Sequence, residues 1–244
     1  MQFQVWRTPG STRPMVLLVP ILAGGGDLME QVGRLMQERG FDVAFCARAG
    51  AALVPPQRGP ELQELFRRTI LHQRLLLAWL RAPANEPPPA VFALGMSLGG
   101  IVATDVAALE PALDGIAIFL SGGDLGSLVA DSSEPRVQRW VDWRYQDDGI
   151  GRDSLQWELH RELGFEPIAM AASVATHKVL LVSAWFDTVV PRRNQDLLWE
   201  ALGRPARLTV PLGHYTSALA IEPILSAAAE HFRSLLPAAG TPPR

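Results

Sequence analysis

The chain of 244 residues has a mass of 26.6 kDa, which suits one compact domain with a substantial core. Its net charge of −3 does not suit a nucleic-acid-binding protein, so no nucleic-acid partner is expected. The single cysteine, Cys46, excludes an internal disulfide, and its apolar neighbours favour a buried thiol over a nucleophile. Because no apolar stretch approaches the ~20 residues of a membrane span and the N-terminus lacks a secretory pattern, we expect a soluble cytoplasmic protein.

Strand-like and helix-like segments alternate along most of the chain, which favours an α/β fold with a mostly parallel sheet flanked by helices. A short edge strand is expected at 3–6, and further strands at 15–19, 42–46, 90–94, 115–120, 178–183 and 207–210. Helices are expected at 28–39, 61–81, 98–109, 195–202 and 217–235. Residues 237–244 are expected to form a frayed tail.

The alternation stops between Asp124 and Ala175, where helical patterns at 135–145 and 153–163 replace strands. This insertion is longer than a connection needs, and it follows a strand end, where ligands of open α/β sheets bind. We therefore predict a core formed by 1–124 and 166–244 and a small helical cap at 125–165. Three tryptophans of this stretch could face the cavity under the cap, namely Trp140, Trp143 and Trp157. The alternative is a set of helices that only pack at the edge of the sheet.

The most informative motif is Gly95-Met96-Ser97-Leu98-Gly99, a G-x-S-x-G pattern between a predicted strand and a predicted helix. In that setting the chain makes a sharp turn that exposes the serine hydroxyl, and the glycines let the strand and the helix approach each other. Ser97 is therefore the candidate nucleophile. The alternative is a glycine-rich turn whose serine has no chemical role.

A serine hydroxyl needs a general base, because it is a poor nucleophile near neutral pH. Of the five histidines, His214 is placed best, in a loop between a predicted strand and the last predicted helix. Asp187 follows the predicted strand 178–183 and could orient His214 and stabilise its imidazolium form. Asp124, which follows the preceding strand, is the alternative acid.

Together these three loops resemble those of the α/β-hydrolase superfamily, and the resemblance covers residues 15–236. The serine motif resembles the family's nucleophile turn, 186–191 its acid loop (Phe-Asp-Thr-Val-Val-Pro) and 213–215 its histidine loop (Gly-His-Tyr). The order serine, aspartate, histidine along the chain is also the order of this family. The resemblance implies a serine hydrolase with an α/β-hydrolase fold and an acyl-enzyme intermediate. Such chemistry uses no organic cofactor and no metal ion.

The resemblance also implies an oxyanion hole, in which two backbone N–H groups stabilise the negative charge of the intermediate. We expect these donors to be the amide of Leu98 and the amide of Leu22, with Ile21 as the alternative to Leu22. Many members of the family carry His-Gly where this chain has Pro20-Ile21, a change that backbone donors tolerate. The glycine run 24–26 is not expected to bind phosphate, because the Lys-Ser/Thr of a P-loop is missing.

Apolar residues near these motifs predict the walls of a substrate pocket, which would suit small carboxylic esters of short to medium acyl length. The predicted lining residues are Met96, Trp185, Phe186, Tyr215, Trp140 and Trp143. Thioesterases, lipases, acyltransferases, peptidases and cofactor-free haloperoxidases use the same three catalytic groups, so these activities stay open. A protein of this fold that binds a small ligand without catalysis is the alternative from another class.

Overall fold

The computed structural model of this chain describes residues 1–237 apart from 11, 25 and 49. Within these residues, seven strands form one sheet in the order β1-β3-β2-β4-β5-β6-β7. The strands are β1 (Phe3–Trp6), β2 (Met15–Val19), β3 (Asp42–Cys46), β4 (Val91–Met96), β5 (Gly115–Phe119), β6 (Val179–Ala184) and β7 (Ala206–Val210). β1 is antiparallel to β3 and lies at the edge, and all other pairs are parallel. The predicted edge strand and the mostly parallel sheet are confirmed.

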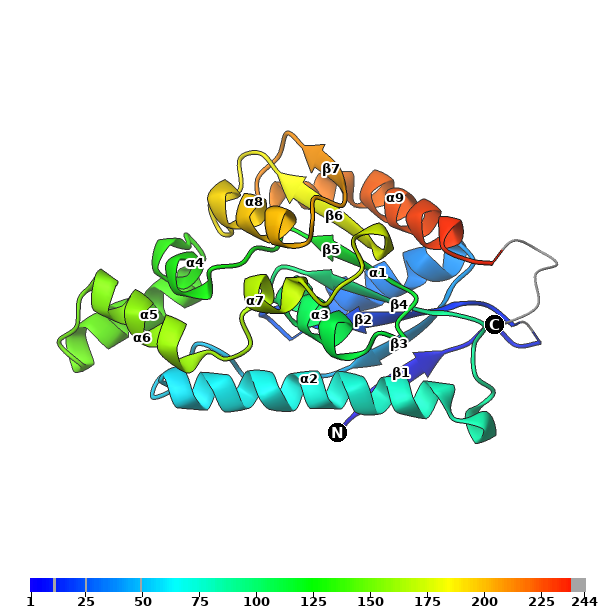
Figure 1. Cartoon of the computed structure of the whole chain (residues 1–244), viewed down its shortest axis with the longest axis horizontal. Coiled ribbons are helices and arrows are strands. Elements are labelled where there is room, and N and C mark those ends of the chain that lie inside the picture. The colour runs from blue at the N-terminus through cyan, green and yellow to red at the C-terminus, as the bar shows by residue number, and fades with distance from the viewer. Residues whose placement is uncertain (11, 25, 49, 238–244) are drawn as a thin grey trace.

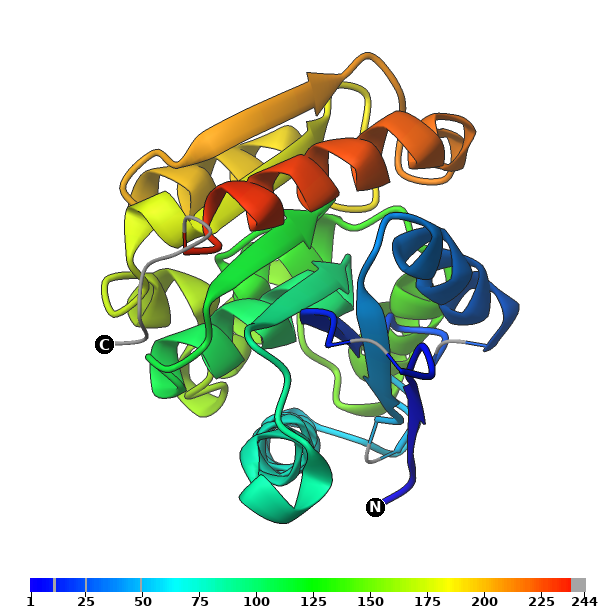
Figure 2. The ribbon, with the colours of Figure 1, turned by 90° about the vertical axis from the view of Figure 1, so that its right-hand side faces the viewer.

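Helices cover both faces of the sheet (Figure 1, Figure 2). One face carries α1 (Gly26–Glu38) and α9 (Ile221–Ser234); the other carries α2 (Gly59–Arg81), α3 (Leu98–Leu109), α7 (Pro167–Ala171) and α8 (Arg192–Ala201). Alternate residues of β2 pack in two hydrophobic cores, one on each face of the sheet. Leu17 packs in the core that α2 and α3 cover, and Leu18 packs in the core that α1 and α9 cover. This alternation is the period of a strand that is buried on both faces.

Three helices lie between β5 and α7 and project from one end of the sheet, at the left in Figure 1. They are α4 (Leu125–Asp131), α5 (Pro135–Asp147) and α6 (Arg152–Glu162). Their apolar side chains form a third core, in which Trp140 and Leu155 pack with Leu62 of α2 and Ile101 of α3. Trp140 is fully buried, and its Nε1 donates to the carbonyl oxygen of Gln57 at 2.9 Å.

Charged groups fasten these helices to the start of α2. The buried guanidinium of Arg144 on α5 pairs with Asp148 and lies 2.7 Å from Oε2 of Glu158 on α6. Arg58, directly before α2, pairs with Asp147 and Asp148 at 2.7 and 2.6 Å. A buried charge is tolerated only when it is paired, so this network fixes how α5 and α6 lie against the rest of the chain.

Most of the predicted helices are observed, and they begin and end within three residues of the predicted bounds. The largest difference is at the last helix, where the predicted stretch divides into the short helix η3 (Thr216–Ala220) and α9. Two further short helices, η1 (Pro83–Asn85) and η2 (Thr176–Lys178), lie in connections. The predicted tail lies outside the described residues beyond Pro237. In the described part of the chain, no helix combines the length and hydropathy of a membrane span.

Candidate active site

Ser97 lies in a tight turn between β4 and α3, with φ of 55° and ψ of −124°. A positive φ at a residue other than glycine is strained and is typical of functional turns. The glycines beside it have no room for a side chain. A Cβ on Gly95 would lie 2.1 Å from the carbonyl oxygen of Gly99, and one on Gly99 would lie 2.4 Å from that of Val19. The predicted sharp turn is therefore present, and glycine is required on both sides of the serine.

His214 and Asp187 meet across the loops that follow β7 and β6. Nδ1 of His214 lies 2.8 Å from Oδ2 of Asp187. The other oxygen, Oδ1, accepts hydrogen bonds from the N–H groups of Val189 and Val190 at 2.9 and 2.8 Å. The Asp187 side chain is fully buried and that of His214 is 11% exposed. This arrangement holds the imidazole by one nitrogen and leaves Nε2 for another partner.

The alternative acid, Asp124, has other partners. It caps α4 by accepting a hydrogen bond from the N–H of Ser127 at 3.3 Å, and its Oδ1 lies 2.9 Å from Nε2 of His160. Of the two candidate acids, the structure therefore brings Asp187 to His214.

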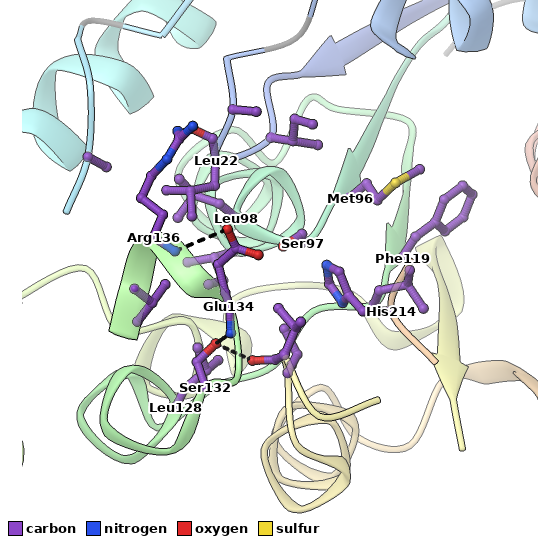
Figure 3. A pocket seen from close by; sticks show the side chains of 18 of the residues that line it. Leu22, Met96, Ser97, Leu98, Phe119, Leu128, Ser132, Glu134, Arg136 and His214 are labelled. Atoms are coloured by element: carbon purple, nitrogen blue, oxygen red, sulfur yellow. Dashed lines mark hydrogen bonds between the residues drawn. The ribbon is translucent and has the colours of Figure 1, made fainter. Parts of the chain in front are cut away.

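Ser97 and His214 share the wall of a cavity of about 260 Å³ (Figure 3). Figure 3 shows the imidazole and Ser97 together on one side of it, with Glu134 and Arg136 on another. Most of the lining is apolar, and α4, α5 and α2 contribute much of it, including Leu125, Leu128, Val129, Val137, Leu62 and Phe66. The volume is close to the lower end of ligand pockets, which span roughly 300–1,000 Å³.

Both predicted oxyanion donors, Leu22 and Leu98, line this cavity, as does the alternative, Ile21. Leu98 is the first residue of α3, so its N–H has no acceptor within the helix. The N–H of Leu22 has no hydrogen-bond acceptor among the described residues. The helix end also favours negative charge at this point, because the first turn of a helix is electropositive.

Only two of the six residues predicted to line the pocket lie in the described wall of the cavity. Met96 and Tyr215 line the cavity, whereas Trp140, Trp143, Trp185 and Phe186 are absent from its described lining. Trp140 fills the core of α4–α6, and Trp143 packs against the guanidinium of Arg58, 5.0 Å from the ring centre. Trp157 is 62% exposed. The prediction that these tryptophans face the cavity is therefore wrong: Trp140 packs in the core of its own helices, and the other two lie against arginine side chains, those of Arg58 and Arg161.

Trp185 and Phe186 lie on the outer side of the acid loop, where they are 53% and 65% exposed. Their N–H groups donate to the carbonyl oxygens of Val210 and Leu212 at 2.9 Å each, which holds this loop against the histidine loop. Trp185 also stacks under Arg192, with the guanidinium 3.6 Å from the ring centre. Their backbone thus supports the site, while their side chains are exposed and are not part of the described cavity lining.

Three charged residues contact the site although no sequence motif indicated them, namely Arg48, Arg136 and Glu134. Nη1 of Arg48 donates to the carbonyl oxygen of Ile21 at 2.9 Å, and Nη1 of Arg136 donates to that of Leu22 at 3.2 Å. The hydroxyl of Tyr215 donates to the carboxylate of Glu134, which precedes α5. These contacts join segments that are 27 to 114 positions apart, so no local pattern could have indicated them.

No protein-family model matches the chain, and no curated protein matches it in sequence. Solved structures do match. A metagenome-derived lipolytic enzyme, from a study of LipS and LipT, has a TM-score of 0.65 at 16% identity, covering 96% of this chain and 97% of that one. The Pyrococcus furiosus esterase Pf2001 has a TM-score of 0.66 at 12% identity, with 95% and 87% covered. The enol-lactonase of Burkholderia xenovorans has a TM-score of 0.60 at 12% identity, with 95% and 96% covered.

Similarity at such low identity establishes the shared fold and leaves the reaction open. The architecture agrees with these matches, since the strained serine turn follows β4 in a mostly parallel sheet. The chain therefore has the α/β-hydrolase fold.

Proposed function

We propose that the protein is a serine hydrolase that cleaves carboxylic esters of short to medium acyl length through Ser97, His214 and Asp187. One observation carries the proposal. Ser97, on its strained turn, and the imidazole that Asp187 holds line the same apolar cavity. A protein that only binds a ligand needs neither the strain of this turn nor a buried carboxylate behind a histidine. This combination favours an enzyme over a non-catalytic binding protein.

The reaction begins when Oγ of Ser97 attacks the ester carbonyl carbon while Nε2 of His214 takes the hydroxyl proton. Asp187 holds the ring with Nδ1–H directed at its carboxylate and stabilises the imidazolium that forms. The tetrahedral intermediate then collapses, and the alcohol leaves with the proton from His214. Water attacks the acyl-enzyme by the same two steps, which releases the acid and restores Ser97.

The N–H groups of Leu98 and Leu22 are the proposed donors to the oxyanion of the tetrahedral intermediate. Both line the cavity, and among the described residues neither has another acceptor. Loss of one such donor in a protease lowers kcat by roughly 10²–10³-fold, so these groups would supply much of the rate enhancement. Backbone donors explain how Pro20 and Ile21 can replace the His-Gly of other members.

Residues 125–165 act as the cap of this site in our proposal, over a core formed by 1–124 and 166–244. The cavity wall supports this division, because Leu128, Val129 and Val137 from these helices line it together with Ser97. Binding of an acyl chain against this aliphatic wall is favoured by about 25 cal/mol for each Å² of apolar surface that becomes buried. The wall offers no such gain to a charged acyl group.

A series of p-nitrophenyl esters from acetyl to dodecanoyl tests the proposal, with the matching acyl-CoA thioesters and peptide anilides run in parallel. We expect the highest kcat/KM for butanoyl or hexanoyl esters and a steep fall toward dodecanoyl. The Ser97→Ala variant gives the background rate. Ester turnover no faster than this background would refute the proposal. Higher kcat/KM on thioesters than on esters would make the protein a thioesterase instead.

A further inference from the structure

Two guanidinium groups hold two successive carbonyl groups of the loop that follows β2. Arg48, which follows β3, donates from Nη1 to the oxygen of Ile21 at 2.9 Å. Arg136 of α5 donates from Nη1 to the oxygen of Leu22 at 3.2 Å. The N–H of Gly24 also donates to the oxygen of Ile21, at 2.9 Å. The loop that carries a proposed oxyanion donor is thus fixed from outside, by side chains of two distant segments.

Because the peptide bond is planar, these contacts also fix the direction of the proposed donor, the N–H of Leu22. In a trans peptide the C=O of one residue and the N–H of the next point in opposite directions. The bonds to the Ile21 oxygen therefore fix the direction of the Leu22 N–H. Rotation of that peptide would break the bonds from both Arg48 and Gly24. The bond from Arg136 fixes the following peptide in the same way, so both peptides that flank the Cα of Leu22 are held.

The charges of the two arginines also favour an oxyanion. Within the described residues, the hydrogen-bond partners of both guanidinium groups are backbone carbonyl oxygens, including that of Gly50 for Arg48. Burial lowers the pKa of Arg48, and the nearby charge of Arg136 lowers that pKa further. The two cations repel each other, and a developing negative charge nearby relieves that repulsion. The carboxylate of Glu134, which accepts a hydrogen bond from the backbone N–H of Arg136 at 3.4 Å, offsets only part of this positive charge.

We propose that Arg48 and Arg136 are positioning residues of the oxyanion hole, which keep the Leu22 N–H directed at the developing oxyanion. The inference rests on the proposed function and deepens it. Because Arg136 belongs to α5, it also links the helical insertion to catalysis. The oxyanion loop is fully held only while α5 lies against it, so the insertion would do more than form a wall of the pocket.

Methionine substitutions test this directly, since they keep much of the side-chain bulk and remove every donor. Arg48→Met and Arg136→Met should each lower kcat on p-nitrophenyl butanoate by about 10- to 100-fold, with KM changed less than about 3-fold. Arg139→Met is the matched control, because Arg139 is exposed on the same helix, and it should keep the wild-type kcat. Arg136→Lys should recover part of the loss, because an ammonium group still donates.

A second measurement separates positioning from general structural support. A trifluoromethyl ketone with a butyl chain forms a tetrahedral adduct with an oxyanion, whereas the corresponding alcohol cannot form an adduct. We expect both methionine variants to lose affinity for the ketone by the same factor as kcat/KM and to bind the alcohol as the wild type does. If a methionine variant does not fold, the ketone and alcohol affinities of the lysine variant at the same position are compared with those of the wild type instead.

The outcomes are distinguishable. An active wild type whose two methionine variants keep full kcat would overturn the positioning role and leave the proposed hydrolase intact. Equal losses of affinity for ketone and alcohol would assign both arginines a merely structural role and overturn the inference as well. A wild type without ester turnover would remove the proposed function itself, and this inference with it.

Discussion

Nδ1 of His214 and Oδ2 of Asp187 lie 2.8 Å apart, although the two residues are 27 positions apart in the chain. The carboxylate cannot turn away from the ring, because its other oxygen accepts two backbone hydrogen bonds, from Val189 and Val190. The direction of the imidazole is therefore fixed before any substrate arrives. Such preorganisation is what a general base needs, since it removes a reorganisation step from the reaction.

Replacing the proposed acid should therefore abolish most activity without unfolding the protein. Asp187→Asn keeps the shape of the side chain, but its amide can donate to Nδ1 and select the wrong tautomer of His214. We expect kcat on p-nitrophenyl esters to fall by about 10³–10⁴-fold, as in a serine protease with the same arrangement. Asp124→Asn is the matched control, because asparagine caps helices as well as aspartate does, and it should keep kcat within about 3-fold. The reverse ranking would make Asp124 the acid.

The serine turn should not tolerate a methyl group at Gly99. A Cβ there would meet the carbonyl oxygen of Val19 at 2.4 Å, and both segments are held by the sheet and by α3. We expect Gly99→Ala to lower the free energy of unfolding in urea by more than about 2 kcal/mol. Gly151→Ala is the control, since Gly151 has negative φ and no atom within 4 Å of an added Cβ. Its effect should stay within about 1 kcal/mol, because the loss of a glycine N-cap at α6 is offset by the smaller conformational freedom of the unfolded chain. Equal stability of the two variants would contradict the described packing.

Acyl-chain preference should respond to the aliphatic wall and not to the tryptophans. Leu128→Phe adds bulk to the cavity, so we expect the longest accepted p-nitrophenyl ester to shorten while butanoyl turnover persists. Trp157→Ala, at an exposed position, should leave the chain-length profile unchanged. Trp140→Ala should cost about 3–5 kcal/mol of stability, because it empties a fully buried site. A changed profile in Trp157→Ala together with an unchanged one in Leu128→Phe would place the acyl site elsewhere.

A buried aspartate on α3 should make stability depend on pH. Asp105 is fully buried, and neither carboxylate oxygen has a hydrogen-bond partner among the described residues. Burial raises the pKa of Asp105 well above its usual value, and the charge of Glu166 adds to the rise. The folded state thus keeps this proton to higher pH than the unfolded state does. Stability falls as pH rises from the unfolded pKa, 3.8, toward the folded one.

Asp105→Asn removes the ionisable carboxyl group and keeps the shape of the side chain. The free energy of unfolding of the variant minus that of the wild type should therefore increase between about pH 4 and pH 8. Urea unfolding at several pH values measures this difference. A difference that is constant across the range would mean that Asp105 ionises equally in the folded and unfolded states.

The sheet and the three candidate catalytic residues could be predicted from the sequence because local patterns encode them. β2 and β3 are short apolar runs between loops, and their bounds agree with the prediction. Ser97, Asp187 and His214 each follow a strand, and the carboxyl ends of parallel strands meet at one edge.

The pocket walls could not be predicted, for two physical reasons. A tryptophan at helical spacing packs against the nearest apolar surface, and for Trp140 that surface is the core of α4–α6. The contact between Arg136 and the carbonyl group of Leu22 spans 114 positions and depends on how α5 lies against the sheet. Neither is a property of a local sequence window.

Covalent labelling by a fluorophosphonate tests the central claim most directly, because the probe reacts only with an activated nucleophile. Intact-mass measurement followed by peptide mapping should show one adduct per chain, on Ser97. Ser97→Ala should give no adduct, and the exposed control Ser173→Ala should be labelled at the wild-type rate. An adduct on another residue, or undiminished labelling of Ser97→Ala, would contradict the account.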